Sequence, residues 1–338
     1  MRSVGYRNSL PIDDPSALMD IELPKPTPTG RDLLVEVRAV SVNPVDTRMR
    51  AGFTPEAGQW NVLGWDAAGV VEEAGPLASL FKPGDEVFYA GALRRPGANA
   101  EFHLVDERIV GRKPRSLSWA EASALALTAL TAWEALFDRL DVKKPAPSVS
   151  PSILITGGGG NVGSMAVQLA RKLTDLTIIA TASRPETQAR AREMGAHHVI
   201  DHSKSLAAQV NALGVGAPGM VFSVSNTDQH LSEILELVAP QGRIAVADDP
   251  ATLDIKFFKH KSISVHWVAM FTRSTFETAD IQAQHALLNE VARLVDDGVI
   301  RTTLTETLGS INAANLRRAH QLVESGRLRG KIALEGFR

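Results

Sequence analysis

The chain has 338 residues, 44% of them hydrophobic and 22% charged, which is the composition of a globular protein of about two domains. Its 36 basic and 38 acidic residues give a formal net charge of −2, which argues against a nucleic-acid or anionic-membrane partner. Cysteine is absent, and this excludes disulfides, thiolate nucleophiles and cysteine-ligated zinc. The beginning of the chain has no apolar secretory segment, and the apolar stretch 122–133 is too short to span a bilayer, so we expect a cytoplasmic protein.

The first third of the chain predicts short strands at 33–40, 69–75 and 86–90, because these runs are apolar or alternating and lie between glycine and proline turns. Short strands of this kind are typical of a small barrel or sandwich. A helix is predicted over 119–139, because Ser118 and Glu121 have the spacing of a capping box.

Beyond residue 152 the pattern becomes an alternation of strands and helices. This alternation predicts an α/β fold with a doubly wound parallel sheet. The predicted strands are 153–156, 176–180, 198–201, 220–224, 243–247 and 263–268, and the predicted helices are 162–173, 186–194, 228–239, 280–297 and 312–325.

A glycine-rich turn follows the first of these strands. Gly158, Gly160 and Gly163 match the pattern G-x-G-x-x-G and open the next helix. Glycine is needed there for the tight turn, for the approach of the backbone to a pyrophosphate, and for close helix–strand packing, while the helix start offers free amides to phosphate. The turn therefore predicts a dinucleotide site.

The end of the second strand of the alternating region predicts NADP rather than NAD. An NAD site usually has an acidic residue there to hold the ribose 2′-hydroxyl. The sequence has Ser183 and Arg184 instead, a hydroxyl and a guanidinium fork that suit a phosphate dianion.

Taken together, these features resemble the medium-chain dehydrogenase/reductase superfamily, its quinone oxidoreductase-like group and, within it, the bacterial zinc-type alcohol dehydrogenase-like branch. The resemblance covers nearly the whole chain. The motifs that carry it are SVNPVD at 41–46, LGWDAAGVV at 63–71, KPGDEV at 82–87, LTALTAW at 127–133, and the tail segments 266–273, 324–326 and 330–332. It implies a GroES-like β-rich catalytic domain formed by residues 1–126 and 271–338, and a Rossmann NADP-binding domain formed by residues 127–270.

The resemblance also implies a set of cofactor-binding residues. Asn43 and Thr128 are expected near the nicotinamide. Ser183, Arg184 and His202 are expected near the adenosine phosphate, and Lys331 is expected to reach the same phosphate. The turn residues complete the set: Gly158, Gly160, Asn161, Val162 and Gly163.

Two departures from the family pattern bear on catalysis. Zinc-dependent members have Cys in the first motif and His in the second, where this chain has Asn43 and Trp65, so we expect no metal. The family's active-site tyrosine is replaced by Arg48, which leaves Tyr89 as a substitute. The catalytic candidates are Asn43 as an oxyanion donor, with Arg48 and Tyr89 behind it.

Several side chains have a structural alternative. Asp46 is a general acid or an ion-pair partner of Arg48 or Arg50, and Arg48 is a ligand contact or only that partner. Tyr89 contacts substrate or packs in the core. His266 is more typical of a hydrogen-bonded interior histidine than of a metal ligand. Apolar cleft or core walls are expected from Trp65, Trp267 and Phe271.

The sequence thus predicts an NADPH-dependent, zinc-independent oxidoreductase that transfers hydride to quinones or α,β-unsaturated carbonyl compounds. One alternative is an alcohol or aldehyde oxidoreductase, and another is a non-catalytic NADPH-binding redox sensor. The strand at 263–268 is expected to be a long apolar sheet edge, which predicts a homodimer.

Overall fold

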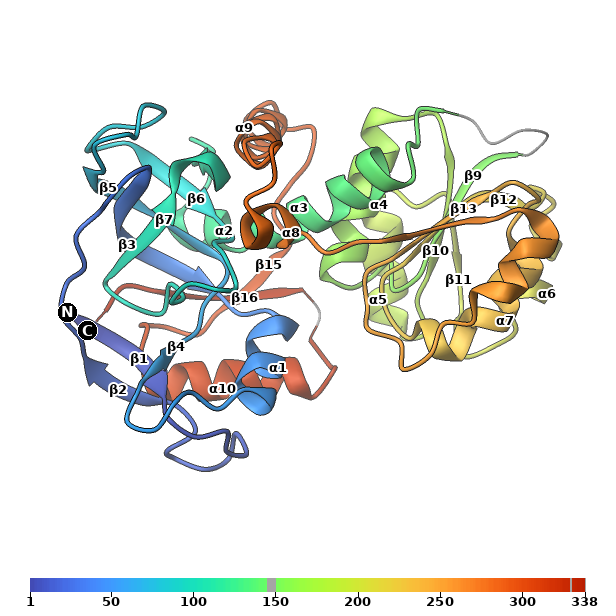
Figure 1. Cartoon of the computed structure of the whole chain (residues 1–338). Coiled ribbons are helices and arrows are strands. Elements are labelled where there is room, and N and C mark those ends of the chain that lie inside the picture. Colours follow the sequence, from blue (N-terminus) through green and yellow to red (C-terminus); the bar gives the residue numbers. More distant parts are fainter. Residues whose placement is uncertain (145–149, 329, 338) are drawn as a thin grey trace. The chain divides into compact units, whose positions relative to one another are not determined.

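The computed structural model describes residues 1–144, 150–328 and 330–337. The chain divides into two compact units (Figure 1). The first unit combines both ends of the chain, Met1–Leu127 and Phe271–Arg338, and the second is the inserted segment Thr128–Met270.

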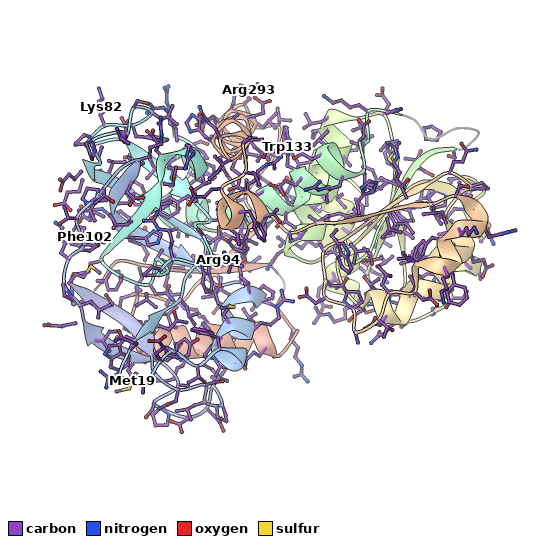
Figure 2. The ribbon with its side chains drawn as sticks, in the orientation of Figure 1. Met19, Lys82, Arg94, Phe102, Trp133 and Arg293 are labelled. Atoms are coloured by element: carbon purple, nitrogen blue, oxygen red, sulfur yellow. The ribbon has the colours of Figure 1, made fainter. Side chains whose placement is uncertain are left out.

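The first unit contains two mainly antiparallel sheets. One has the order β2-β1-β4, and the other has the order β15-β16-β3-β5-β6-β8, with β7 also paired to β3. The bounds of the strands are β1 (Arg2–Tyr6), β2 (Met19–Glu22), β3 (Asp32–Ser41), β4 (Asn61–Val62), β5 (Ala67–Ala74), β6 (Glu86–Tyr89), β7 (Phe102–Asp106), β8 (Val110–Arg112), β15 (Leu304–Thr307) and β16 (Lys331–Glu335). The exposed side chains of Met19 on β2 and Lys82 before β6 lie at the periphery of this unit (Figure 2).

The helix predicted over 119–139 is broken into three pieces. The capping box of Ser118 and Glu121 is present, but the helix it starts ends at Ser123. A new helix begins at Ala126, and the Asp66 carboxylate supports its first turn by accepting a hydrogen bond from the backbone amide of Leu127 at 2.8 Å. The pieces are α2 (Trp119–Ser123), α3 (Ala126–Trp133) and a π-helical segment, Glu134–Arg139.

Four further α-helices and one 3₁₀ turn lie in the described part of the first unit. The sequence predicted the last two of these α-helices and missed the other two and the turn. The bounds are α1 (Pro44–Gly52), α8 (Thr272–Phe276), α9 (Ala283–Asp296) and α10 (Ala313–Glu324), with a single 3₁₀ turn at Glu107–Ile109.

The second unit is a six-stranded parallel sheet with the order β11-β10-β9-β12-β13-β14. Figure 1 shows helices on both sides of it, with α4 on one side and α6 and α7 on the other. This arrangement confirms the predicted doubly wound α/β fold. The strands are β9 (Ser150–Ile155), β10 (Thr177–Thr181), β11 (His198–Ile200), β12 (Pro218–Ser223), β13 (Arg243–Val246) and β14 (Ser264–Trp267), and the helices are α4 (Asn161–Leu173), α5 (Pro185–Glu193), α6 (Leu206–Ala212) and α7 (Thr227–Leu237).

Burial on both faces explains why the central strands are continuously apolar. On β9, Leu154 packs into a core with the apolar faces of α6 and α7, while Ile153 and Ile155 are equally buried on the opposite face. The edge strand β14 differs from expectation, because it has four residues and includes Ser264 and His266. Within the described ranges, no helix combines the length and apolarity needed to cross a bilayer.

Candidate cofactor and catalytic sites

The glycine turn lies between β9 and α4, as the sequence predicts. Gly157 turns the chain with a φ of +62°, and Gly160 donates a backbone hydrogen bond back to it at 2.8 Å. A Cβ at Gly158 would lie 2.5 Å from the Cβ of Ala180, and one at Gly163 would lie 2.2 Å from the carbonyl oxygen of Gly157. The turn therefore packs too closely for a larger residue at Gly158 or Gly163, and the first amides of α4 stay available for a phosphate.

Asn161 and Val162 form the first turn of α4, and both are half-buried. The side-chain oxygen of Asn161 is buried, and the described residues give it no hydrogen-bond partner. A buried acceptor without a donor is unfavourable, so this position suits a ligand that brings its own hydroxyl. Both the shape of the turn and this unpartnered acceptor of Asn161 therefore fit a dinucleotide.

The carboxyl end of β10 presents the two residues expected to read the adenosine phosphate. Ser183 and Arg184 are half-buried, and Arg184 directly precedes α5. The Nε atom of Arg184 lies 3.8 Å from a carboxylate oxygen of Glu186 in the first turn of that helix. The separation exceeds hydrogen-bond length, so the guanidinium keeps donors for a phosphate.

His202 lies two residues beyond the end of β11, and its Nδ1 atom is 3.2 Å from the hydroxyl of Thr181. Burial lowers the pKa of His202, and the neighbouring His230 and Arg184 lower it further, against an opposing effect of Asp201. Arg184 is therefore close enough to act on the ring. The second unit thus brings Arg184 and His202 together at adjacent strand ends.

Three strands assemble a second group of polar residues inside the first unit. Antiparallel pairing places Ala333 of β16 opposite Ser41 of β3. Lys331 lies two residues before Ala333 and Asn43 lies two residues after Ser41, so the same register brings these two residues side by side. Ser41 also donates its amide to the carbonyl of Asp66 at 2.9 Å, which brings Asp66 beside both. We refer to Asn43, Asp46, Asp66 and Lys331, each at most 1% exposed, as the buried polar cluster.

Hydrogen bonds connect this cluster internally. The Lys331 ammonium donates to Asp66 Oδ2 at 2.6 Å and to Asn43 Oδ1 at 2.5 Å. The Asn43 side-chain amide donates to Asp66 Oδ2 at 3.0 Å. Asp46 accepts from the backbone amides of Asn43 at 2.7 Å and Gly64 at 3.0 Å. The cluster is therefore largely satisfied from within.

Burial is the main electrostatic influence on the two carboxyl groups. It raises the pKa of Asp46 to about 7, and the Lys331 ammonium acts in the opposite direction. Burial also raises the pKa of Asp66, while Lys331 and the hydrogen bonds from Leu127 and Asn43 oppose the rise. Desolvation raises the pKa of a carboxyl group because it disfavours the charged form, and an adjacent cation lowers that pKa because it favours the charged form.

The cluster changes three expectations. Lys331 was expected at the adenosine phosphate, but its ammonium is enclosed in the first unit between Asp66 and Asn43. Asn43 was expected to donate to an oxyanion, but its amide already donates to Asp66 and the residue is only 1% exposed. For Asp46, one of the two alternatives was an ion pair with Arg48 or Arg50, but its carboxylate accepts from two backbone amides, and Arg50 binds Glu324 at 2.5 Å.

Tyr89 packs in the core, which is the structural alternative for this residue. It is 1% exposed, its hydroxyl lies 3.1 Å from His103 Nδ1, and its ring stacks on that imidazole at 5.5 Å. His103 Nε2 in turn lies 2.9 Å from the carbonyl of Pro96. Burial raises the pKa of Tyr89 and lowers the pKa of His103 to about 4. The pair is a neutral, enclosed contact, and a role for Tyr89 in substrate binding is not supported.

The other expected positions are divided between surface and core. Arg48 is exposed on α1, and Thr128 is 1% exposed in the first turn of α3. Trp65 is a core residue that meets Phe271 edge to face at 6.5 Å. Trp267 is 55% exposed, so it lies outside the core, and it lines a surface hollow of the second unit together with Ile255 and Val265.

His266 also differs from expectation. We expected a hydrogen-bonded interior ring, but the described residues provide no partner for its buried Nε2.

The residues at the family's zinc position do not fit that metal. Zinc needs thiolate, imidazole or carboxylate ligands, and the chain has no cysteine. At this place Asn43 presents an amide already engaged, Trp65 has no ligand atom, and Asp66 is held by an ammonium. In the part of the chain that the structure describes, no three His, Asp or Glu residues gather as a metal group would require.

Sequence reasoning missed Asp66 and Thr181 as organising residues. Asp66 lies in a motif that was noted only for its resemblance, and its partner Lys331 is 265 positions away. Thr181 lies just beyond the strand predicted over 176–180, and no role was assigned to it. Neither position has a local signal, because each contact depends on the register of strands that are distant in the chain.

Comparisons with known proteins agree with this geometry. A model of the alcohol dehydrogenase GroES-like domain matches residues 29–115, and one of the zinc-binding dehydrogenase family matches residues 161–284. A zinc-type alcohol dehydrogenase-like protein of Staphylococcus aureus is 37% identical over 99% of both chains. The chain belongs to the medium-chain dehydrogenase/reductase superfamily. It combines a GroES-like domain with a Rossmann-like parallel sheet, and it is an NAD(P)-dependent oxidoreductase of that superfamily.

Solved structures give the same fold over the whole chain. A Rhizobium etli protein described as a candidate zinc-dependent alcohol dehydrogenase is 62% identical, covers 100% of this chain and 98% of its own, and has a TM-score of 0.98. The Escherichia coli quinone oxidoreductase, solved with NADPH, is 22% identical, covers 99% and 100%, and has a TM-score of 0.82. At that identity the second likeness concerns the fold alone.

Proposed function

We propose that this protein is an NADPH-preferring, zinc-independent oxidoreductase that reduces quinones or α,β-unsaturated carbonyl compounds. The observation that carries the proposal is the end of β10, where Ser183 and Arg184 stand in place of an acidic residue. An acid there would hold a ribose hydroxyl and repel a phosphate, whereas a guanidinium binds a phosphate through charge-assisted hydrogen bonds.

The roles of the cofactor residues follow from this reading. Gly158, Gly160 and Gly163 shape the turn, and Asn161 and Val162 with the first amides of α4 face the pyrophosphate. Ser183, Arg184 and His202 bind the phosphate of the adenosine ribose. Asn43 and Thr128 border the nicotinamide by packing, since the Asn43 amide is engaged within the buried polar cluster. When bound, the nicotinamide supplies hydride to an electrophilic carbon.

The choice of substrate class rests on the buried polar cluster. The side chains of this cluster do not suit zinc as ligands. Without a Lewis acid, the carbonyl group of a plain ketone is poorly polarised. A quinone or enone spreads the developing negative charge over a conjugated oxygen, so modest hydrogen-bond donors and solvent suffice. With Asn43 and Tyr89 engaged internally, exposed Arg48 is the donor that we retain, and water supplies the proton.

A substrate screen tests this proposal. Zinc-free protein should oxidise NADPH with a panel of quinones and enones, and Arg48→Ala should raise KM or lower kcat for those substrates. Faster oxidation of simple alcohols with NADP⁺ would favour the alcohol dehydrogenase reading that the names of the relatives suggest. NADPH binding without turnover of any compound would favour a binding protein. Activity that requires added zinc would contradict the proposal directly.

We further propose a homodimer formed at the edge strand β14. Apolar side chains are exposed at that edge: Trp267 of β14 is 55% exposed, and Ile255, which lines one hollow with Val265 and Trp267, is 65% exposed. An open parallel edge with such a patch favours pairing with a second copy. Light scattering should report a dimer, and Val265→Pro should give monomers. A wild-type monomer would contradict this part of the proposal.

A further inference from the structure

Thr181, the last residue of β10, connects the glycine turn to His202. The residue is fully buried. Its backbone carbonyl accepts from the amide of Gly158 at 2.9 Å, and its hydroxyl accepts from the amide of Gly157 at 3.0 Å. The same hydroxyl lies 3.2 Å from Nδ1 of His202. One side chain therefore contacts both the turn and the histidine.

The direction of these hydrogen bonds follows from the donors available. A backbone amide can only donate, so the Thr181 hydroxyl is the acceptor towards Gly157. Its own proton then needs an acceptor, because a buried hydroxyl proton without one is unfavourable. Among the described residues the acceptor within reach is Nδ1 of His202. Nδ1 must then be unprotonated, and the proton of the neutral ring lies on Nε2.

The surroundings of His202 keep the ring neutral near pH 7. Burial lowers its pKa, and His230 and Arg184 lower it further, while Asp201 alone among the named charges acts in the opposite direction. The His230 ring, on α7, lies with its centroid 6.0 Å from that of His202. Lys204, beyond His202, is turned towards Asp201, with its ammonium 3.8 Å from that carboxylate.

We propose that Thr181 is a positioning residue for cofactor selectivity. Its hydroxyl holds His202 in the Nε2–H tautomer, and His202 donates that proton in a hydrogen bond to the phosphate of the adenosine ribose, beside Arg184. The inference rests on the proposed preference for NADPH. It adds a physical link, because the turn that receives the pyrophosphate and the ring that reads the second phosphate share one hydroxyl.

The tautomer can be measured in the protein without cofactor. In ¹⁵N-labelled protein, long-range proton–nitrogen spectra at pH 7.5 should show His202 with a protonated Nε2 and a bare Nδ1. The resonance is assigned by its loss in His202→Phe. Thr181→Val should give a mixture of tautomers, and Thr181→Ser should restore the single one. A protonated Nδ1 in the wild-type protein would overturn the inference.

Binding then tests selectivity through the ratio of the Kd for NADH to the Kd for NADPH. We expect this ratio to fall about tenfold in His202→Phe, as for loss of one hydrogen bond to a charged group. Thr181→Val should lower it similarly, Thr181→Ser should restore it, and the double variant should fall no further than His202→Phe. A general loss of folding would weaken the binding of both cofactors equally and leave the ratio of their Kd values unchanged.

The matched control is His198→Phe, the same change at the opposite end of β11. Its ratio should equal that of the wild type. If the wild-type protein binds both cofactors equally, the proposed function and this inference both fail. If it prefers NADPH but the ratio is unchanged in His202→Phe and Thr181→Val, this inference alone fails.

Discussion

The two units each hold a group of polar side chains, and the groups differ in how their hydrogen bonds are used. In the second unit, Ser183, Arg184 and His202 are half-buried and keep donors for a ligand. In the first unit, the buried polar cluster directs its donors and acceptors at itself. A buried polar group is stable only when it is paired. The internally paired cluster of the first unit therefore supports the fold, whereas the half-buried group of the second unit is suited to binding a ligand.

The strongest disruption of this contrast is Lys331→Met. It leaves the carboxylate of Asp66 buried without its cation, which typically costs about 3–5 kcal/mol of unfolding free energy. Urea denaturation at pH 7 measures the loss. Adding Asp66→Asn to this variant should recover part of it, because the uncompensated charge is removed. A loss below about 1 kcal/mol would mean that the cluster is not the closed structural unit described.

The corresponding change in the second unit is Arg184→Glu. Loss of a charge-assisted hydrogen bond, worth about 1.5–3 kcal/mol, and repulsion of the phosphate should weaken NADPH binding about 10²-fold, with little effect on NADH. Stability should change by less than about 0.5 kcal/mol, as for other surface sites. Fluorescence titration with both cofactors measures this.

Arg192→Glu is the control for that variant, since Arg192 is exposed on α5, the helix that Arg184 directly precedes, and the charge change is identical. Its affinity for NADPH should stay near that of the wild type. An equal loss in both variants would assign the effect to net charge and not to a phosphate contact.

Asn43→Ala sharpens the comparison at a residue expected to be catalytic. The amide bridges Lys331 and Asp66, so its removal should lower the unfolding free energy by about 1–3 kcal/mol. Because the amide is engaged internally, kcat per folded molecule should change less than about threefold. A large fall in kcat with unchanged stability would restore Asn43 as an oxyanion donor.

His320 on α10 provides the smallest test, through pH. Burial, and then the charge of Arg50, lower the pKa of this ring to about 3, well below the ordinary value of 6.5. Between these two pKa values the unfolded chain binds a proton at His320 and the folded chain does not. The contribution of the neutral ring to the unfolding free energy is therefore fully present above pH 6.5 and is lost as the pH falls towards 3. When the pH is lowered from 7 to 5.5, His320 should decrease the unfolding free energy by about 1 kcal/mol.

The comparison variant for this effect is His320→Leu. Its unfolding free energy should fall about 1 kcal/mol less over that pH interval than the wild-type value does. Equal slopes in the two proteins would show that His320 titrates normally in the folded state.

Local patterns predicted the second unit well. The G-x-G-x-x-G turn, each apolar strand and the absence of an acid after β10 can each be recognised from a short segment of the chain, and the structure has the turn, the strands and the helix where they were expected. The exceptions are instructive. The helix over 119–139 is broken, and Asp66, which directly precedes β5, accepts a hydrogen bond from the backbone amide of Leu127 in the first turn of the new helix α3.

The first unit was less predictable for the same physical reason. Its strands are short and mostly antiparallel between segments far apart in the chain, and α1 and β16 lack a strong periodic pattern. Lys331 looked like a tail residue that could reach a phosphate. Only the pairing of β16 with β3 shows that it lies against Asn43 and Asp66 instead.

The central claim joins cofactor choice to the absence of zinc, and one measurement on a single sample addresses both. The sample is dialysed protein whose metal content is determined, and the quantity is the ratio of kcat/KM for NADPH to that for NADH with one enone. We expect a ratio of about 10² or more, from the phosphate contacts of Arg184, with far less than one zinc per chain. A ratio near one, or turnover that appears only when zinc is restored, would contradict the account.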